Sequence, residues 1–154
     1  MQSPPTSEWV TVTPSPLSPD QLSAWVSDPA SGAIVTFFGT VRDSSTTGND
    51  IVSLEYETSE ELAERRIAVV IAVARSRWPE VGRIAIHHRV GEIELGGVAV
   101  VVAVSSPHRQ EAFEAAKFCI DAVKKTVPMW KREVWVGGST WSEEATDILN
   151  AEDL

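Results

Sequence analysis

The positive charge of this chain is concentrated in one short stretch, PHRQEAFEAAKFCIDAVKKTVPMWKR, which spans residues 107–132. All four lysines of the sequence lie in it: Lys117, Lys124, Lys125 and Lys131. With Arg109 and Arg132 they make six cations against three acidic residues, so the stretch carries a net charge of +3, although the whole chain carries −9. Because opposite charges attract, an acidic protein that gathers its cations in one place is expected to bind an anion there.

Apolar residues in this stretch recur with a helical period and predict a helix over residues 107–126. The residues of this stripe are Phe113, Ala116, Ile120 and Val123, spaced three or four apart as on one face of a helix. At about 100° per residue, Arg109 falls on the stripe, Lys124 lies about 60° from its centre and Lys125 about 160° away. We therefore expect Lys124 to be held near the protein body and Lys125 to point into solvent.

Other cations stand where a binding site could use them. His108 and Arg109 lie in the first turn of the predicted helix, where unpaired N–H groups and the positive end of the dipole favour an anion. Lys131 follows Lys124 after a proline turn, so we expect both ammonium groups in one cleft. Arg42 ends a predicted buried strand and precedes a loop, a rigid base for a side chain that reaches a site. The alternative is that these cations are solvated, as cations near helix ends usually are.

Several other kinds of site are excluded. His87 and His88 are adjacent in a predicted strand and point to opposite faces, so they cannot bind one metal together. The single cysteine, Cys119, completes no zinc site and is expected to pack inside the helix. The sequence contains no Gly-rich phosphate loop, G-x-S-x-G elbow or dinucleotide-binding fingerprint. It therefore indicates no metal and no cofactor, and the net charge of −9 argues against nucleic acid as a partner.

The composition is that of one soluble domain. The chain has 154 residues, of which 43% are hydrophobic and 23% charged, within the usual range for a globular protein. The N-terminus, MQSPPTSEW, lacks the basic and apolar regions of a secretory signal, and the apolar run over residues 98–104 is too short to span a membrane. One cysteine fits a reducing compartment, so we expect a cytoplasmic protein without a membrane partner.

The order of the predicted elements indicates an α+β fold with a mostly antiparallel sheet and two long helices. Strands are predicted over residues 9–13 (a short edge strand), 32–42, 52–57, 83–90, 97–106 and 131–136, and helices over 19–25, 59–78 and 107–126. Within VSLEYE, the alternation of Val52, Leu54 and Tyr56 with polar residues predicts a half-buried strand. We divide the chain into a flexible N-terminal arm (1–20), one domain (21–140) and a C-terminal tail (141–154), with a possible helix over 142–151.

Four strings of the sequence resemble the large, catalytic subunit of molybdopterin synthase, the MoaE family. They are GAIVTFFGTVRD, HHRVGEIELGG, SSPHRQEAFEAAKFCID and KKTVPMWKRE, in this order. The resemblance extends from about Gly32 to Glu133, and its specific feature is PHR paired with a lysine before VPxWK. The chain departs from the family pattern at Gly97, where the family often has an acid, and loosely in TSEELAERR. The tail after Gly138 matches least, and none of these departures touches the basic residues.

This resemblance implies a fold, a reaction and a set of site residues. The fold would be an α/β-hammerhead-like single domain, with two copies forming a homodimer within a heterotetramer. Each copy would bind a small ubiquitin-like sulfur carrier subunit whose C-terminal Gly-Gly ends in a thiocarboxylate. Sulfur would pass to cyclic pyranopterin monophosphate to form the dithiolene of molybdopterin. The resemblance implies catalytic roles for Lys124 and Lys131 and substrate contacts for Arg42, His108 and Arg109, the last two offered across the dimer interface.

Two further functions remain open on the sequence alone. A non-catalytic anion-binding or partner-scaffolding module would need the same cations but no half-buried Lys124. An enzyme of another kind would use Lys124 to form a Schiff base with a carbonyl substrate. In the sulfur-transfer reading, Lys124 acts either as a charge stabiliser or as a proton-transfer group, and Cys119 is not needed because the sulfur arrives with the partner.

Overall fold

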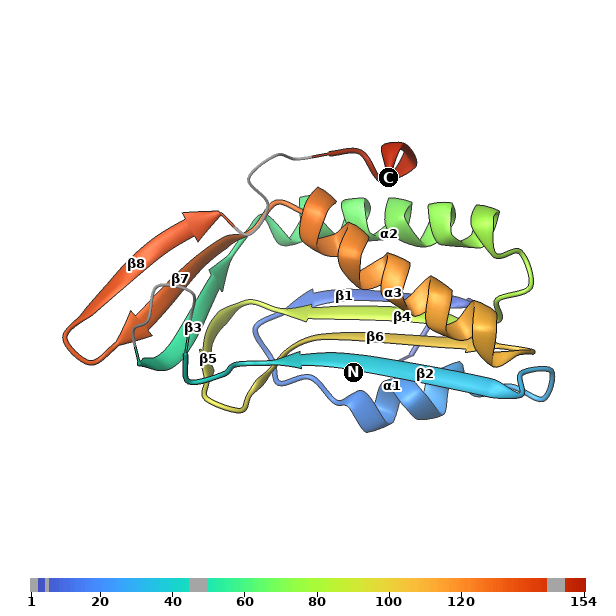
Figure 1. Cartoon of the computed structure of the whole chain (residues 1–154), viewed down its shortest axis with the longest axis horizontal. Helices are drawn as coiled ribbons and strands as arrows, with labels where there is room; N and C mark the ends of the chain where they lie inside the picture. The colour runs from blue at the N-terminus through green and yellow to red at the C-terminus, as the bar shows by residue number, and fades with distance from the viewer. Residues whose placement is uncertain (1–2, 5, 45–49, 144–148) are drawn as a thin grey trace.

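The computed structural model describes residues 3–4, 6–44, 50–143 and 149–154, with eight strands and three α-helices among them (Figure 1). The strands are β1 (Glu8–Thr13), β2 (Ala33–Thr40), β3 (Ile51–Glu57), β4 (Ile84–Arg89), β5 (Gly91–Glu94), β6 (Val98–Ser106), β7 (Trp130–Trp135) and β8 (Gly138–Glu143). The helices are α1 (Pro19–Val26), α2 (Glu60–Arg77) and α3 (Arg109–Thr126), followed by a short 3-10 turn, η1 (Ala151–Asp153). Within the described residues, no helix is long and apolar enough to cross a membrane.

The strands form two four-stranded sheets, in the orders β1-β4-β6-β2 and β5-β3-β7-β8. Every pair of neighbouring strands is antiparallel except β1 and β4, which run parallel. The predicted α+β fold with mostly antiparallel pairing and two long helices is confirmed, although two sheets replace the single sheet expected. The chain passes from the first sheet to the second at Gly91, whose φ of 83° is one that residues with a side chain rarely adopt.

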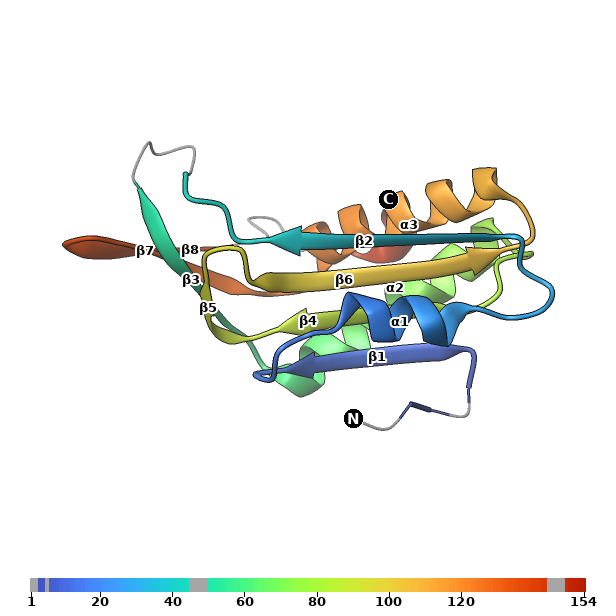
Figure 2. The same cartoon turned by 90° about the horizontal axis from the view of Figure 1, so that it is seen from below.

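Helices cover both faces of the first sheet. The long helices α2 and α3 lie on one face and α1 lies on the other (Figures 1 and 2). The strand β6 is buried over nearly its whole length: Val100, Val102 and Val104 belong to the larger core, whereas Val101 and Ala103 pack with α1. This burial on both faces explains the continuous apolar run of that strand. The second sheet extends to one side, at the end where α3 stops (Figure 1).

Most predicted boundaries are met within two residues, and the differences have physical reasons. The helix α3 was predicted to begin at residue 107, but the strand before it, β6, extends through Ser106, which pairs with Ala33 of β2. The helix therefore begins after His108, which is its N-cap residue. In β3 a register shift between Ile51 and Ser53 breaks the predicted alternation, so Val52 is 42% exposed whereas Tyr56 is buried.

The two ends of the chain contribute to the folded part. The edge strand β1 was predicted, and it pairs with β4 although its residues fall within the stretch predicted as an arm. At the other end, the predicted helix over 142–151 starts within β8, and residues 144–148 lie outside the described part of the chain. The division into arm, domain and tail stays a prediction.

Candidate active site

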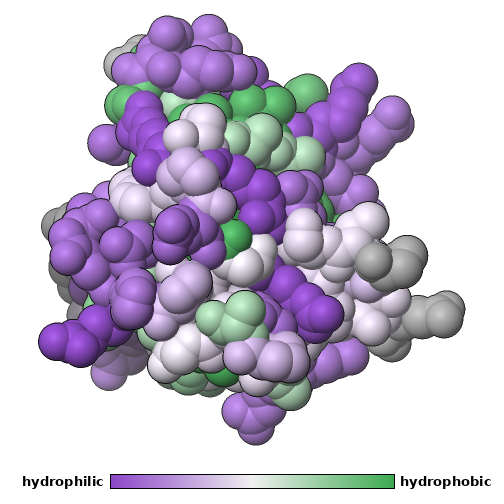
Figure 3. Space-filling view, turned by 90° about the vertical axis from the view of Figure 1, so that its right-hand side faces the viewer, coloured by the Kyte–Doolittle hydropathy of each residue, from purple (hydrophilic) through white to green (hydrophobic). Residues whose placement is uncertain are grey.

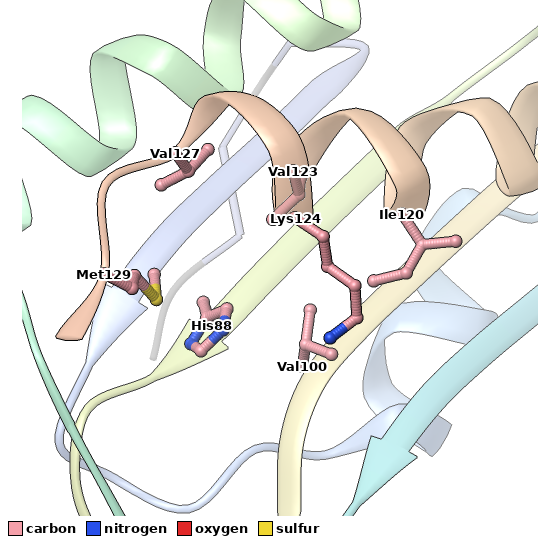
Figure 4. A pocket seen from close by; sticks show the side chains of 7 residues that line it. All are labelled: His88, Val100, Ile120, Val123, Lys124, Val127 and Met129. Atoms are coloured by element: carbon pink, nitrogen blue, oxygen red, sulfur yellow. The ribbon is translucent and has the colours of Figure 1, made fainter. Parts of the chain in front are cut away.

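A narrow pocket lies where α3 ends above the first sheet (Figure 4). Its lining residues come from β4, β6, α3 and the segment after α3: His88, Val100, Ile120, Val123, Lys124, Val127 and Met129. Its volume of about 10 Å³ leaves room for about one water molecule. Five of these seven side chains are apolar, so an occupant of the pocket would meet two polar groups of the lining, the ammonium of Lys124 and the imidazole of His88.

The two neighbouring lysines of the last turn of α3 take different directions. The Lys124 side chain extends from α3 toward Val100 of β6 and lines the pocket (Figure 4). Lys125 is turned about 100° from it around the helix axis, and its carbonyl accepts a hydrogen bond from the N–H of Leu149 (3.3 Å). Lys124 therefore contacts the protein body, as the helical period predicts, although its side chain remains exposed to solvent.

The buried face of α3 contains Ala116, Ile120 and Val123 of the predicted stripe but not Phe113. Its buried residues are Ala112, Ala115, Ala116, Cys119, Ile120, Ala122, Val123 and Thr126. Small residues such as Ala112 and Ala115 let the helix approach the sheet, and Phe113 is turned outward with 63% of its surface exposed. Cys119 packs inside, as predicted, and burial raises the pKa of its thiol to about 12. A thiol that stays protonated is a poor nucleophile.

His88 is fixed in the pocket by two contacts. Its Nδ1 lies 2.8 Å from the carbonyl oxygen of Arg89, and because a carbonyl only accepts, Nδ1 carries the proton of this hydrogen bond. The imidazole also meets the ring of Tyr56 edge-to-face, with centroids 5.0 Å apart. His87 points to the opposite face, as predicted, where it packs on Trp9 with centroids 4.6 Å apart. Burial there lowers the pKa of His87 to about 4.

Lys131 approaches the same region from the second sheet. On β7 it lies directly opposite Tyr56 of β3, and residues opposite each other in an antiparallel pair have their side chains on one face. Tyr56 in turn contacts His88 of the pocket. The Lys131 side chain is half-buried, with its Nζ 4.0 Å from Oε1 of Glu133. The structure thus brings Lys124 and Lys131 toward one region through Tyr56 and His88, residues that sequence reasoning did not assign to the site.

Arg42 lies at the pocket end of the first sheet. It follows β2, in which Gly39 pairs with the pocket residue Val100 on β6. The chain just before Arg42 is anchored by a hydrogen bond from the N–H of Val41 to the carbonyl of Gly97 (3.0 Å). Arg42 itself is exposed, so its guanidinium is available to a ligand that enters from solvent.

His108 and Arg109 lie at the opposite end of α3. At about 1.5 Å per residue, the helix separates Arg109 from Lys124 by about 22 Å along its axis. Both residues are exposed, and hydrophilic side chains cover most of the surface at this end of the molecule (Figure 3). Within one chain, therefore, His108 and Arg109 are not brought together with Lys124.

A mostly apolar groove lies between α3 and β2. The exposed side of Phe113 faces this groove of about 380 Å³, with Phe37 on the β2 side. Phe38 and Ile34 of the same strand are also exposed, by 48% and 43%. Among the described strands, β2 is the last of its sheet, so one of its edges presents backbone groups to which none of these strands pairs. Apolar side chains and a strand edge at one place are typical of a surface that another chain covers.

A signal for His88 was present in the sequence. It stands two and four residues after Ile86 and Ile84, and these three residues share one face of β4. Both isoleucines belong to the core under α2 and α3, so His88 is a polar residue on an otherwise apolar face. For the described residues, no group of three or more His, Cys, Asp or Glu side chains is arranged to hold a metal ion.

Comparison with known proteins gives a consistent result. The family model described as "MoaE protein" matches residues 12–126. The molybdopterin synthase catalytic subunit of Nostoc sp. is 44% identical over 131 residues, which cover 84% of this chain and 79% of the relative. That of Bacillus subtilis is 42% identical over 130 residues, which cover 84% of this chain and 82% of the relative.

Solved structures agree with the sequence comparison. Molybdopterin synthase from Staphylococcus aureus superposes with a TM-score of 0.80 at 35% identity, covering 86% of this chain and 95% of that one. A complex of subunits 1 and 2 of the molybdopterin-converting factor from Helicobacter pylori shares the fold, with a TM-score of 0.69 at 18% identity over 92% of this chain and 94% of that one. The chain therefore belongs to the MoaE family.

Proposed function

We propose that this protein is the catalytic subunit of a molybdopterin synthase. It transfers sulfur from the thiocarboxylated C-terminus of a small ubiquitin-like partner to cyclic pyranopterin monophosphate, and this forms the dithiolene of molybdopterin. Membership of the MoaE family supports the reaction. The observation that carries the proposal for this chain is Lys124, which lines a narrow pocket at the end of α3.

The pocket has the shape and charge that such a donor requires. The pocket itself has room for only about one water molecule, so a donor that reaches its opening beside Lys124 must end in a thin chain, as a Gly-Gly tail without side chains is. The thiocarboxylate and the phosphate of the pterin are both negative and repel each other. The ammonium groups of Lys124 and Lys131 offset this repulsion, hold both reactants together and stabilise charge that develops during the transfer.

The remaining cations of the site are proposed to bind the substrate. Arg42 stands at the pocket end of β2 and is suited to bind the phosphate with its guanidinium fork. His108 and Arg109 join the site from a second copy of the chain. In a two-fold dimer the same surface of both copies meets. If the edge of β2 and the Phe113 groove form that surface, the two α3 helices run in opposite directions. The N-terminal end of one α3 then comes close to the pocket end of the other.

We infer a homodimer that binds one small partner per copy. The apolar groove at Phe113 supports the contact between copies. The structure from Helicobacter pylori, described as a complex of two subunits of the molybdopterin-converting factor, supports the second kind of contact. Cys119, the single cysteine of the chain, fits a reducing compartment, and a cytoplasmic location stays a prediction.

The test is the reaction itself. The purified protein is incubated with a thiocarboxylated small partner and cyclic pyranopterin monophosphate, and the dithiolene product is detected. Formation of the dithiolene that depends on all three components supports the proposal. Binding of the partner and the pterin without any product would instead fit a scaffolding module. Trapping of a carbonyl substrate on Lys124 by borohydride would indicate Schiff-base chemistry.

A further inference from the structure

We propose that His88 is the proton acceptor that activates a water molecule in the Lys124 pocket and so releases the sulfur from the donor's acyl group. This inference rests on the proposed function and names a residue for a step that the two lysines do not perform. His88 comes from β4, is 6% exposed and lines the same pocket as Lys124.

The chemistry of the donor requires this step. When the thiocarboxylate sulfur bonds to a carbon of the substrate, the donor's acyl group stays joined to that sulfur as a thioester. The sulfur is free only when the bond between the acyl carbon and sulfur breaks, and the acyl carbon then needs an oxygen atom in its place. Water supplies that oxygen, and a base that takes a proton from the water accelerates its attack, typically by about 10²–10⁴-fold.

The pocket is suited to hold one such water molecule. Its volume of about 10 Å³ corresponds to roughly a single water. His88 and Lys124 are the polar residues of its lining, and an ordered water needs two or more polar partners. The surrounding side chains of Val100, Val123 and Met129 are apolar, so they offer the water no other hydrogen-bond partner and direct it toward His88 and Lys124.

The ring of His88 is held in the tautomer that a base requires. Its Nδ1 donates to the carbonyl of Arg89 over 2.8 Å, and in a neutral imidazole the lone pair then lies on Nε2. The edge-to-face contact with Tyr56, at 5.0 Å and 77°, fixes the plane of the ring. A base oriented by a second residue is the usual arrangement at catalytic sites.

The step balances as a hydrolysis of the thioester. The water oxygen bonds to the acyl carbon while one water proton passes to Nε2 of His88. The bond between the acyl carbon and sulfur breaks, and its electron pair leaves with the sulfur, which takes the proton back from His88. The donor is left as a carboxylic acid that releases its proton to solvent. Lys124 stabilises the negative oxygen of the tetrahedral intermediate, and no oxidant or reductant is consumed.

His87 provides a matched control next to His88. It is also buried, at 2% exposure, but it faces the opposite side of β4 and packs on Trp9 in the smaller core under α1. Replacing either histidine removes an imidazole from a buried position of the same strand. Only the loss of His88 alters the pocket, so loss of packing and loss of the base can be told apart.

The experiment compares His88→Asn with His87→Asn in the reaction with thiocarboxylated partner and cyclic pyranopterin monophosphate. Asparagine keeps a donor near the position of Nδ1 but cannot accept a proton. We expect His88→Asn to form dithiolene about 10²–10⁴-fold more slowly. A covalent adduct of partner and substrate should accumulate and be seen by intact-protein mass spectrometry. His87→Asn should form no adduct. A folded His88→Asn protein that keeps the wild-type rate, or that is slow without any adduct, overturns the inference.

A second measurement needs no variant and separates this inference from the proposed function. The wild-type reaction is run in water labelled with oxygen-18. The oxygen-18 content of the partner's C-terminal carboxylate is then measured by mass spectrometry. We expect one labelled oxygen for each sulfur transferred. Dithiolene formation without label in the carboxylate overturns the water step and leaves the proposed function intact. If the wild-type protein forms no dithiolene at all, the proposed function itself fails.

Discussion

Tyr56 of β3 packs edge-to-face on His88 of β4, and this contact joins the second sheet to the Lys124 pocket. The two ring centroids are 5.0 Å apart, and Tyr56 is buried with 7% of its surface exposed. On the other side, Tyr56 stands opposite Lys131 in the pairing of β3 with β7. Tyr56 therefore links the strand position of Lys131 to His88, which lines the pocket together with Lys124.

Replacing Tyr56 should harm activity more than folding. We expect Tyr56→Leu to lower the free energy of unfolding by about 1–3 kcal/mol, since it removes an aromatic contact and leaves a small gap. The rate of dithiolene formation should fall by at least about tenfold, because His88 and Lys131 lose their fixed positions and misplaced groups react slowly. Urea unfolding and product formation are measured side by side, with Val52→Ala on the exposed side of β3 as the control. A folded Tyr56→Leu protein with full activity would contradict this role.

The sequence predicts the elements of this fold better than the way they face each other. Both long helices were predicted, and the stripe of α3 correctly contains Ala116, Ile120 and Val123. Phe113 was misplaced because the stripe left out Ala112 and Ala115, and these small residues are buried where Phe113 was expected. Tyr56 and His88 were missed as site residues because their contact joins two sheets, and a pairing between distant strands leaves no periodic trace in the sequence.

Arg42 and Arg109 should contribute to the affinity for the pterin more than to the affinity for the small partner. We expect Arg42→Ala and Arg109→Ala to weaken binding of cyclic pyranopterin monophosphate by about 10- to 100-fold, as the loss of a charge-assisted hydrogen bond of about 1.5–3 kcal/mol predicts. Binding of the small partner should change little. Calorimetric titration of each ligand separately gives both constants, with Arg65→Ala as a control at an exposed arginine of α2. Equal losses of affinity for the pterin and for the small partner would contradict the assignment of Arg42 and Arg109 to the pterin.

Sharing of the site between two copies can be tested by mixing variants. At a pterin concentration too low for Arg109→Ala to bind it, Lys124→Ala and Arg109→Ala should each show little activity alone. If Arg109 acts in the site of the other copy, a mixed dimer contains one site in which both residues are intact. Random exchange of copies then restores about a quarter of the wild-type activity, since half of the dimers are mixed and each has one working site. A mixture that stays inactive although light scattering shows exchanged dimers would mean that Arg109 acts within its own chain.

His87 should make the protein sensitive to acid. Its pKa in the folded state is lowered to about 4 from 6.5, because burial disfavours the charged imidazole. Its unfolded-state pKa is higher, so protons bind preferentially to the unfolded chain. The stability it contributes is complete above about pH 6.5 and is lost progressively as the pH falls toward 4, by up to about 3 kcal/mol.

Urea unfolding at pH 7.5 and 4.5 measures this loss in the wild type and in His87→Leu. Leucine suits the apolar cluster around Trp9 and cannot take a proton, so the variant should lose less stability between the two pH values. The carboxylates are the same in both proteins and cancel in the comparison. Equal losses of stability in the two proteins would show that His87 is not the acid-sensitive group.

The comparison of Lys124→Ala with Lys125→Ala tests most directly whether Lys124 carries the sulfur transfer. The two residues are adjacent and chemically identical, so a difference between the variants reflects direction rather than total charge. Dithiolene formation is measured at saturating partner and pterin, and circular dichroism confirms that each protein is folded. We predict that Lys124→Ala abolishes the reaction, Lys125→Ala leaves it nearly intact, and Lys131→Ala falls between them. Equal activity of the Lys124→Ala and Lys125→Ala proteins, whether full or lost, would contradict the claim that Lys124 in the α3 pocket carries the chemistry.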